Sequence, residues 1–108
     1  MEDKLIKVSL KRKYTSFVYQ AKEILKEHEQ VELHGLGEAT ANTVRAAEML
    51  CSLGYATLAK FETVSVSEED HGGVSRSRAK IIIVLNKAAS FEKAYADFES
   101  NKTTRKIE

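Results

Sequence analysis

The sequence lacks the features that mark disulfide-bonded, membrane-spanning and secreted proteins. It contains one cysteine, which excludes an internal disulfide framework and suits a reducing compartment. No apolar run approaches the roughly 18 residues of a membrane-spanning helix. The first residues, MEDKLIKVSLKRK, lack the apolar core of a secretory signal. We therefore expect an intracellular protein, located in the cytoplasm, the nucleus or both.

Residue patterns for catalysis and metal binding are also scarce. The histidines His28, His34 and His71 are scattered, and no histidine or cysteine has a partner at metal-ligand spacing. Cys51 falls in an apolar helical stretch, where a thiol packs as a small hydrophobic group. The three adjacent carboxylates at 68–70 could hold a cation, but an exposed acidic loop tip explains them better. We expect no metal, no cofactor and no enzymatic activity.

Positive charge is not in excess, but it is clustered. Lysine and arginine number 17 against 16 acidic residues, so the net charge of +1 does not identify a partner. Lys11, Arg12 and Lys13 are consecutive, and we call this run the basic turn. Arg76 and Arg78 form a second group. Local basic groups on a nearly neutral domain can still bind polyanions.

The pattern of apolar residues predicts one α/β domain. Strands are expected at Leu5 to Leu10, Val31 to His34, Ala56 to Ser67 and Ala79 to Leu85. Helices are expected from a cap at Thr15 or Ser16 to Glu29, from Glu38 to Leu53, and briefly after Ser90. The order β-α-β-α-β-β plus a short C-terminal helix predicts an α/β two-layer sandwich, a small mixed sheet with two helices on one face. We expect the domain to cover residues 1–100, with a disordered tail at 101–108.

The two long helices differ in how much of their surface is apolar. The first has an apolar stripe and a charged half, expected to be solvated, that includes Lys22, Glu23, Lys26 and Glu27. The second is apolar around well over half its girth. It either lies deep in the core or presents a contact surface to a partner subunit.

The stretch from Val31 to Tyr55 predicts a strand, a tight GLG turn at 35–37 and a helix that ends at Gly54. A GxG turn suggests a phosphate-binding loop. However, Thr40 stands where a dinucleotide fingerprint has its third glycine, and Glu38 would repel a phosphate. The turn therefore organises the fold and is not expected to bind a nucleotide.

The basic turn and the two arginines remain as candidates for binding nucleic acid. The basic turn precedes the first helix, whose free backbone N–H groups add to the attraction for phosphate. Arg76 and Arg78 follow Gly72-Gly73 in a polar stretch, 67–78, that is too long for a tight hairpin turn and is expected to be a loop. Tyr14 offers a surface on which an unpaired base could stack. The alternative is ordinary surface charge.

Four stretches give the chain a resemblance to a known family. They are KVSLKRK before the first helix, VELHGLGEATANTV at the second strand and turn, GYA at the third strand, and GGVSRSRAKIIIVL in the last hairpin. In this order, from about Lys7 to Phe98, the sequence resembles the Alba family of small nucleic-acid-binding proteins from archaeal chromatin and their eukaryotic RNA-associated relatives. The SFEKAYADF extension is more similar to plant and protist members than to archaeal ones.

The resemblance implies the β-α-β-α-β-β fold, a dimer, and binding to RNA, DNA or both. Lys11 and Arg12 match a basic pair that contacts the nucleic-acid backbone in the family. The hairpin from Glu68 to Arg78 matches an arm that reaches into a groove. Dimer contacts through the second helix and the nearby sheet imply an interface at Met49, Leu50 and Leu53.

The sequence also departs from the family pattern. Archaeal members carry basic residues around the GxG turn, where this chain has Leu36 and Glu38, and Asn42 stands where lysine is common. Lys13 takes the place of a proline that usually follows the basic pair. The missing charge should weaken duplex binding across the centre, which favours RNA over DNA compaction. Asn42 and Arg45, on the second helix, are still expected in the nucleic-acid surface.

A different class of function fits the apolar second helix. The chain would then be a heterodimerising scaffold subunit of an RNA–protein complex, like the RNase P/MRP protein pairs that the Alba family also resembles. A nuclease is a third alternative, and it would need the carboxylates at 68–70 to bind a metal.

Overall fold

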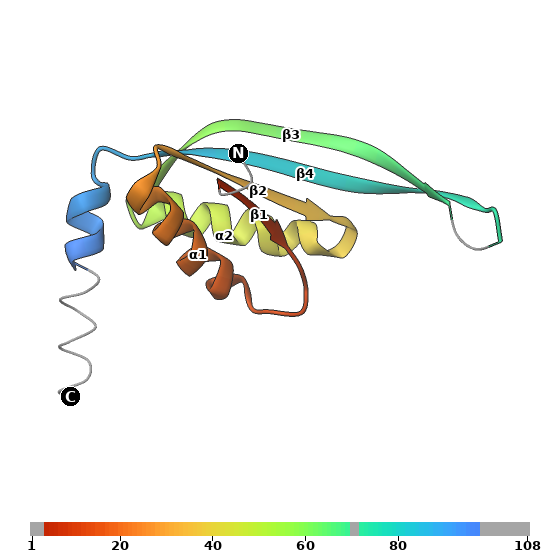
Figure 1. Ribbon diagram of the computed structural model, residues 1–108, viewed down its shortest axis with the longest axis horizontal. Helices are drawn as coiled ribbons and strands as arrows, with labels where there is room; N and C mark the ends of the chain where they lie inside the picture. Colours follow the sequence, from red (N-terminus) through yellow and green to blue (C-terminus); the bar gives the residue numbers. More distant parts are fainter. Residues whose placement is uncertain (1–3, 70–71, 98–108) are drawn as a thin grey trace.

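The computed structural model describes residues 4–69 and 72–97, which form a four-stranded sheet with two long helices on one face (Figure 1). The elements are, in chain order, β1 (Leu5–Val8), α1 (Tyr14–Glu27), β2 (Gln30–Leu36), the 3-10 turn η2 (Gly37–Ala39), α2 (Thr40–Ser52), β3 (Ala56–Glu69) and β4 (Ser75–Lys87). Residues 91–97 form a further short helix. This order confirms the predicted α/β two-layer sandwich. The tail predicted at 101–108 lies outside the described residues.

The sheet is mixed, with strand order β1-β2-β4-β3. β1 is parallel to β2, whereas the β2–β4 and β3–β4 pairs are antiparallel. Every second residue of β2 and β4 faces the helices, and these residues are at most 5% exposed: Val31, Leu33, Ile81, Ile83 and Leu85. They pack against the apolar sides of α1 and α2 to form the core. No described helix is long and apolar enough to cross a membrane.

The first long helix differs from its prediction at both ends. α1 begins at Tyr14, and its N-cap is Lys13, which makes no side-chain capping hydrogen bond. The predicted cap at Thr15 or Ser16 is therefore wrong. The helix also ends at Glu27, earlier than predicted. Of its N-terminal N–H groups, that of Ser16 donates to the carbonyl of Lys13 at 3.0 Å.

The second long helix ends where the sequence predicts. Gly54 has a φ of 89°, in the region that favours glycine. Its N–H donates to the carbonyl of Cys51 at 3.2 Å, and the N–H of Tyr55 donates to the carbonyl of Leu50 at 2.9 Å. These two bonds form a Schellman motif, which confirms Gly54 as the C′ residue of α2. The N-terminus differs: the predicted helical start at Glu38 belongs to the 3-10 turn η2, and α2 itself begins at Thr40.

Lys22 is buried, so its predicted place on a solvated helix face is wrong. Only 5% of the residue is exposed. Its ammonium lies 5.0 Å from the ring centroid of Tyr55 and 5.7 Å from that of Tyr95. Both rings attract the cation through their negative faces. Tyr95 belongs to the C-terminal helix, and its hydroxyl donates to Glu23 Oε2 at 2.9 Å, a bond that raises the pKa of Tyr95. The C-terminal helix therefore docks on α1 and covers Lys22.

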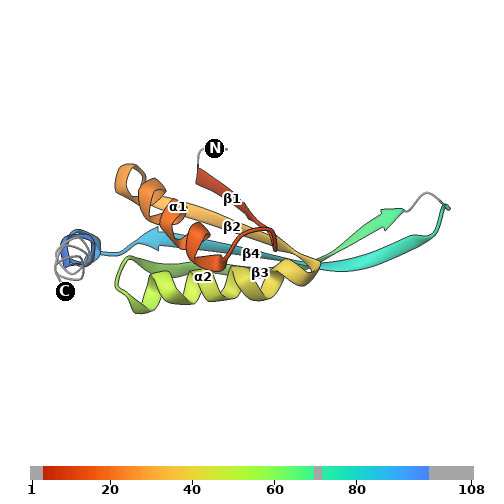
Figure 2. The same cartoon turned by 90° about the horizontal axis from the view of Figure 1, so that it is seen from below.

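β3 and β4 extend beyond the helices as a two-stranded arm, with pairing from Val66↔Arg78 to Glu69↔Ser75 (Figure 1). The predicted loop at 67–78 is therefore wrong over most of its length, because only residues 70–74 lie between the two strands. An arm that no helix covers buries neither face, so its sequence lacks the alternation that marks a strand. Figure 2 shows the arm at one end of the sheet and the C-terminal helix at the other.

Candidate nucleic-acid interface

The basic turn forms one wall of an open hollow between β1 and α1. Its side chains Lys11, Arg12 and Lys13 are all exposed. The hollow has a volume of about 370 Å³, and its lining adds Leu10, Tyr14, Thr15 and Asn42. Asn42 is the third residue of α2. The start of α2 thus also lines the hollow.

Tyr14 and Arg45 join the two helices beside this hollow. The guanidinium carbon of Arg45 lies 5.9 Å from the ring centroid of Tyr14, a cation–π arrangement. Tyr14 is half-buried and packs against the edge of the core. The contact holds the ring in place at the first residue of α1. Six of the eight side chains predicted to bind nucleic acid are therefore gathered at this one site: Lys11, Arg12, Lys13, Tyr14, Asn42 and Arg45.

The other two predicted residues, Arg76 and Arg78, lie on the arm and within β4. Residues two apart on a strand point to the same side, so the arginines share one side of β4 with Lys80. Arg78 packs on the GLG turn, because a Cβ added to Gly37 would lie 3.1 Å from its guanidinium carbon. Arg76 pairs in register with Glu68, farther out along the arm. The two arginines thus mark the base and the middle of the arm.

The three predicted dimer residues are in different environments. Leu50 is fully buried in the chain's own core, which leaves it no surface for a partner. Met49 is half-buried against that core, whereas Leu53 is 52% exposed. Of the three, Leu53 presents the largest free apolar surface.

A larger exposed apolar surface lies on the edge strand β3, which the sequence analysis missed. Leu58 and Phe61 pair with Leu85 and Ile83, so they lie on the helix-facing side of the sheet. They are nevertheless 58% and 52% exposed, because α2 covers only part of β3. We call these two residues, with the exposed Val44 of α2 and Leu53 at the C-cap of α2, the apolar edge.

The described residues offer little for catalysis. Within them, no three His, Cys, Asp or Glu side chains are placed to hold a metal ion. Burial raises the pKa of the Cys51 thiol, and the charge of Glu48 adds to this effect, so the reactive thiolate is disfavoured. Of the predicted acidic loop tip, Glu69 is the last residue of β3, while the Glu68 side chain and Asp70 lie outside the described residues.

Comparisons with known proteins identify the family of this chain. The family model for Alba matches residues 4–68. An uncharacterized protein of Arabidopsis thaliana, At2g34160, is 34% identical over 87 residues, which cover 80% of this chain and 67% of that protein.

Two solved structures share the fold. ALBA1 from Trypanosoma brucei superimposes with a TM-score of 0.79 at 23% identity, over 97% of this chain and 87% of that one. Alba from Thermoplasma volcanium has a TM-score of 0.68 at 16% identity, over 77% and 99% of the two chains. The family match covers more than half of the sequence, and the fold agrees with it. The chain therefore belongs to the Alba family, whose members are generally dimeric nucleic-acid-binding proteins.

Proposed function

We propose that the protein binds RNA, DNA or both without enzymatic activity, mainly through phosphate contacts from the basic turn and the arm. The observation that carries this proposal is the hollow where three exposed cations, a positioned tyrosine and Asn42 converge. Phosphate contacts position a nucleic acid without reading its sequence, so the binding should be sensitive to salt and tolerant of sequence. Leu36, Glu38 and Asn42 supply no positive charge at the centre, which favours RNA over compacted DNA.

The native ligand can be identified by crosslinking inside cells, in the cytoplasm and nucleus where we propose the protein acts. Ultraviolet crosslinking and sequencing of the recovered fragments should yield RNA in greater amount than DNA. The same recovery from a strain that carries glutamine at Lys11, Arg12 and Lys13 provides the control. Recovery that does not depend on these three residues would contradict the assignment of the site.

The arm is expected to add contacts of its own. Replacing Arg76 and Arg78 with alanine should weaken binding to single-stranded RNA and duplex DNA by about tenfold at 0.1 M salt, since two phosphate contacts are lost. Thermal unfolding must be measured beside binding, because Arg78 packs on Gly37. The single variant Arg76→Ala separates the two effects. A fall in thermal stability that accounts for the whole loss of binding would assign the arginines a structural role instead.

We further propose that the apolar edge is the dimer interface. Val44, Leu53, Leu58 and Phe61 are each at least 42% exposed and come from two adjacent elements. An exposed apolar surface of this kind is typical of a protein–protein contact. Sedimentation of the pure protein should give a homodimer, and Phe61→Glu should give a monomer that keeps its fold.

The alternative is a heterodimerising scaffold subunit, in which the same apolar edge meets a related chain. The pure wild-type protein would then aggregate or sediment as a monomer and bind isolated RNA poorly. The matched control for Phe61→Glu is Tyr19→Glu, because Tyr19 is 59% exposed but lies on α1, outside the apolar edge. A monomeric wild-type protein with strong RNA affinity would contradict both forms of the dimer proposal.

A further inference from the structure

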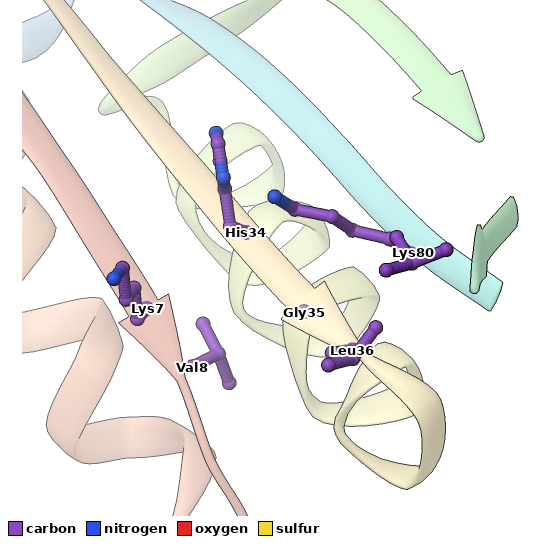
Figure 3. Close-up of a pocket in the computed structure, with 7 residues that line it drawn as sticks. Lys7, Val8, His34, Gly35, Leu36 and Lys80 are labelled. Atoms are coloured by element: carbon purple, nitrogen blue, oxygen red, sulfur yellow. The ribbon is translucent and has the colours of Figure 1, made fainter. Parts of the chain in front are cut away.

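A second hollow lies on the open face of the sheet, on the side opposite the helices. It has a volume of about 240 Å³ and takes residues from all four strands. Figure 3 shows the Lys80 side chain extending from β4 toward β2, near His34, with Leu36 at the end of β2. The lining residues used below are Lys7 of β1, His34 and Leu36 of β2, Val66 of β3 and Lys80 of β4.

The strand register brings these side chains together. Lys7 pairs with His34 across β1 and β2, and Leu36 pairs with Lys80 across β2 and β4. Paired residues of neighbouring strands project from the same face, and strand spacing is only about 4.8 Å. The residues next to them in the chain, such as Leu33 and Ile81, are buried under the helices. The two lysines therefore flank one hollow from both sides of β2.

The charges in this hollow are unbalanced. His34 Nε2 lies 2.8 Å from Glu32 Oε2, so the carboxylate of Glu32 is engaged by the imidazole. In the part of the chain that the structure describes, neither Lys7 nor Lys80 has an acidic partner. Lys80 is half-buried, and a cation removed from water is stabilised by an anion. Leu36 and Val66 add an apolar wall beside it.

The two hollows lie on either side of the end of β1. Val8 lines the hollow on the open face, and Leu10 lines the hollow at the basic turn. Only Ser9 lies between Val8 and Leu10 in the chain, so the Cα atoms of Val8 and Leu10 are at most about 7 Å apart. A nucleic-acid duplex is stiff over a persistence length of about 150 base pairs and does not fold around such an edge. A single strand is flexible enough to do so.

We propose that the open-face hollow is a phosphate subsite for single-stranded nucleic acid, which continues there from the basic turn around the end of β1. This inference rests on the proposed function. Lys7 and Lys80 hold one phosphate group between them, and Leu36 and Val66 contact the adjoining sugar. Duplex nucleic acid contacts the basic turn and the arm without entering this hollow.

The test compares two probes, a short unstructured single-stranded RNA and a duplex DNA of the same length, each with a fluorescent label. Replacing Lys7 and Lys80 with glutamine should lower the affinity for the single strand by about tenfold at 0.1 M salt. Affinity for the duplex should stay within about twofold. Lys60→Gln is the matched control, since Lys60 lies on the open face of β3 but already has a partner, Glu62 Oε1, at 3.7 Å. It should change neither affinity.

An equal loss for both probes, or no loss for the single strand, would overturn the subsite. Failure of the subsite can be told apart from failure of the proposed function. If only the subsite is wrong, the variant at the basic turn should still show a lower affinity for both probes. A second readout needs no substitution. The imidazole NMR signals of His34 should shift on titration with the single-stranded RNA and stay in place with the duplex. Unmoved signals at saturating RNA would also contradict the proposal.

Discussion

Replacing Lys11, Arg12 and Lys13 together with glutamine is expected to lower the affinity for single-stranded RNA and duplex DNA by about a hundredfold at 0.1 M salt. Each lost phosphate contact removes about 0.7 to 0.9 from the slope of log K against log salt, so three contacts remove roughly 2 to 3. The three side chains are exposed and line the hollow beside the start of α1. Fluorescence anisotropy across a series of salt concentrations measures both quantities.

The control for this variant removes charge elsewhere on the surface. Lys60 and Lys93 are exposed, and each already has a carboxylate partner, Glu62 at 3.7 Å and Asp97 at 3.7 Å. Replacing both with glutamine should leave the slope nearly unchanged. If the control loses as much affinity as the triple variant, net charge and not the basic turn governs binding.

The second large effect is expected on stability, from Gly35→Ala. Gly35 of β2 lies directly against Thr43 of α2. A Cβ at this position would overlap Thr43 Oγ1 and lie 2.9 Å from Thr43 Cβ, closer than real Cβ atoms approach. It would also lie 3.0 Å from the carbonyl oxygen of Ala39, a tight contact. Thr43 is fully buried, and its hydroxyl donates to that same carbonyl at 2.8 Å, so it cannot move aside easily. Overpacking of this kind costs about 2 to 3 kcal/mol, which lowers the Tm by roughly 10 °C or more.

Thermal unfolding followed by circular dichroism measures this loss, and Gly73→Ala provides the contrast. Gly73 has no atom within 4 Å of an added Cβ, and its substitution carries only the backbone cost of a φ of 79°. That cost is about 1 kcal/mol. Adding Thr43→Ala to Gly35→Ala should restore part of the lost stability, because it removes the Thr43 hydroxyl oxygen, the atom nearest to the added Cβ. A Gly35→Ala protein as stable as the wild type would mean that the β2–α2 contact is looser than the structure has it.

The fold could be predicted because most of its signals are local. Alternation in β1 and β2, the 3.6-residue spacing of the helices and the glycine at 54 each act over a few residues, and the structure agrees with them. The arm was missed because alternation appears only where one face is buried. Lys22 was misplaced because the helix that covers it lies far along the chain, and spacing within α1 cannot reveal that contact.

The candidate site also contains residues that are neighbours in the chain and residues that only the fold brings together. The basic turn is contiguous, so its three cations were evident as a group, and Asn42 was found through the family pattern. The hollow on the open face joins Lys7 to Lys80 through β2, and only the strand register brings these residues together. The burial of Leu50 and the exposure of the apolar edge depend on how much of the sheet α2 covers. A helical pattern gives the width of an apolar face but not the extent of the sheet beneath it.

The most direct measurement is the affinity of the wild-type protein for a short single-stranded RNA and a duplex DNA as salt is raised. Binding of both probes is predicted, with log K falling linearly against log salt and a slope of about −3 or steeper. Affinity that does not change with salt, or the absence of binding to either probe at low salt, would contradict phosphate recognition by the basic turn and the arm.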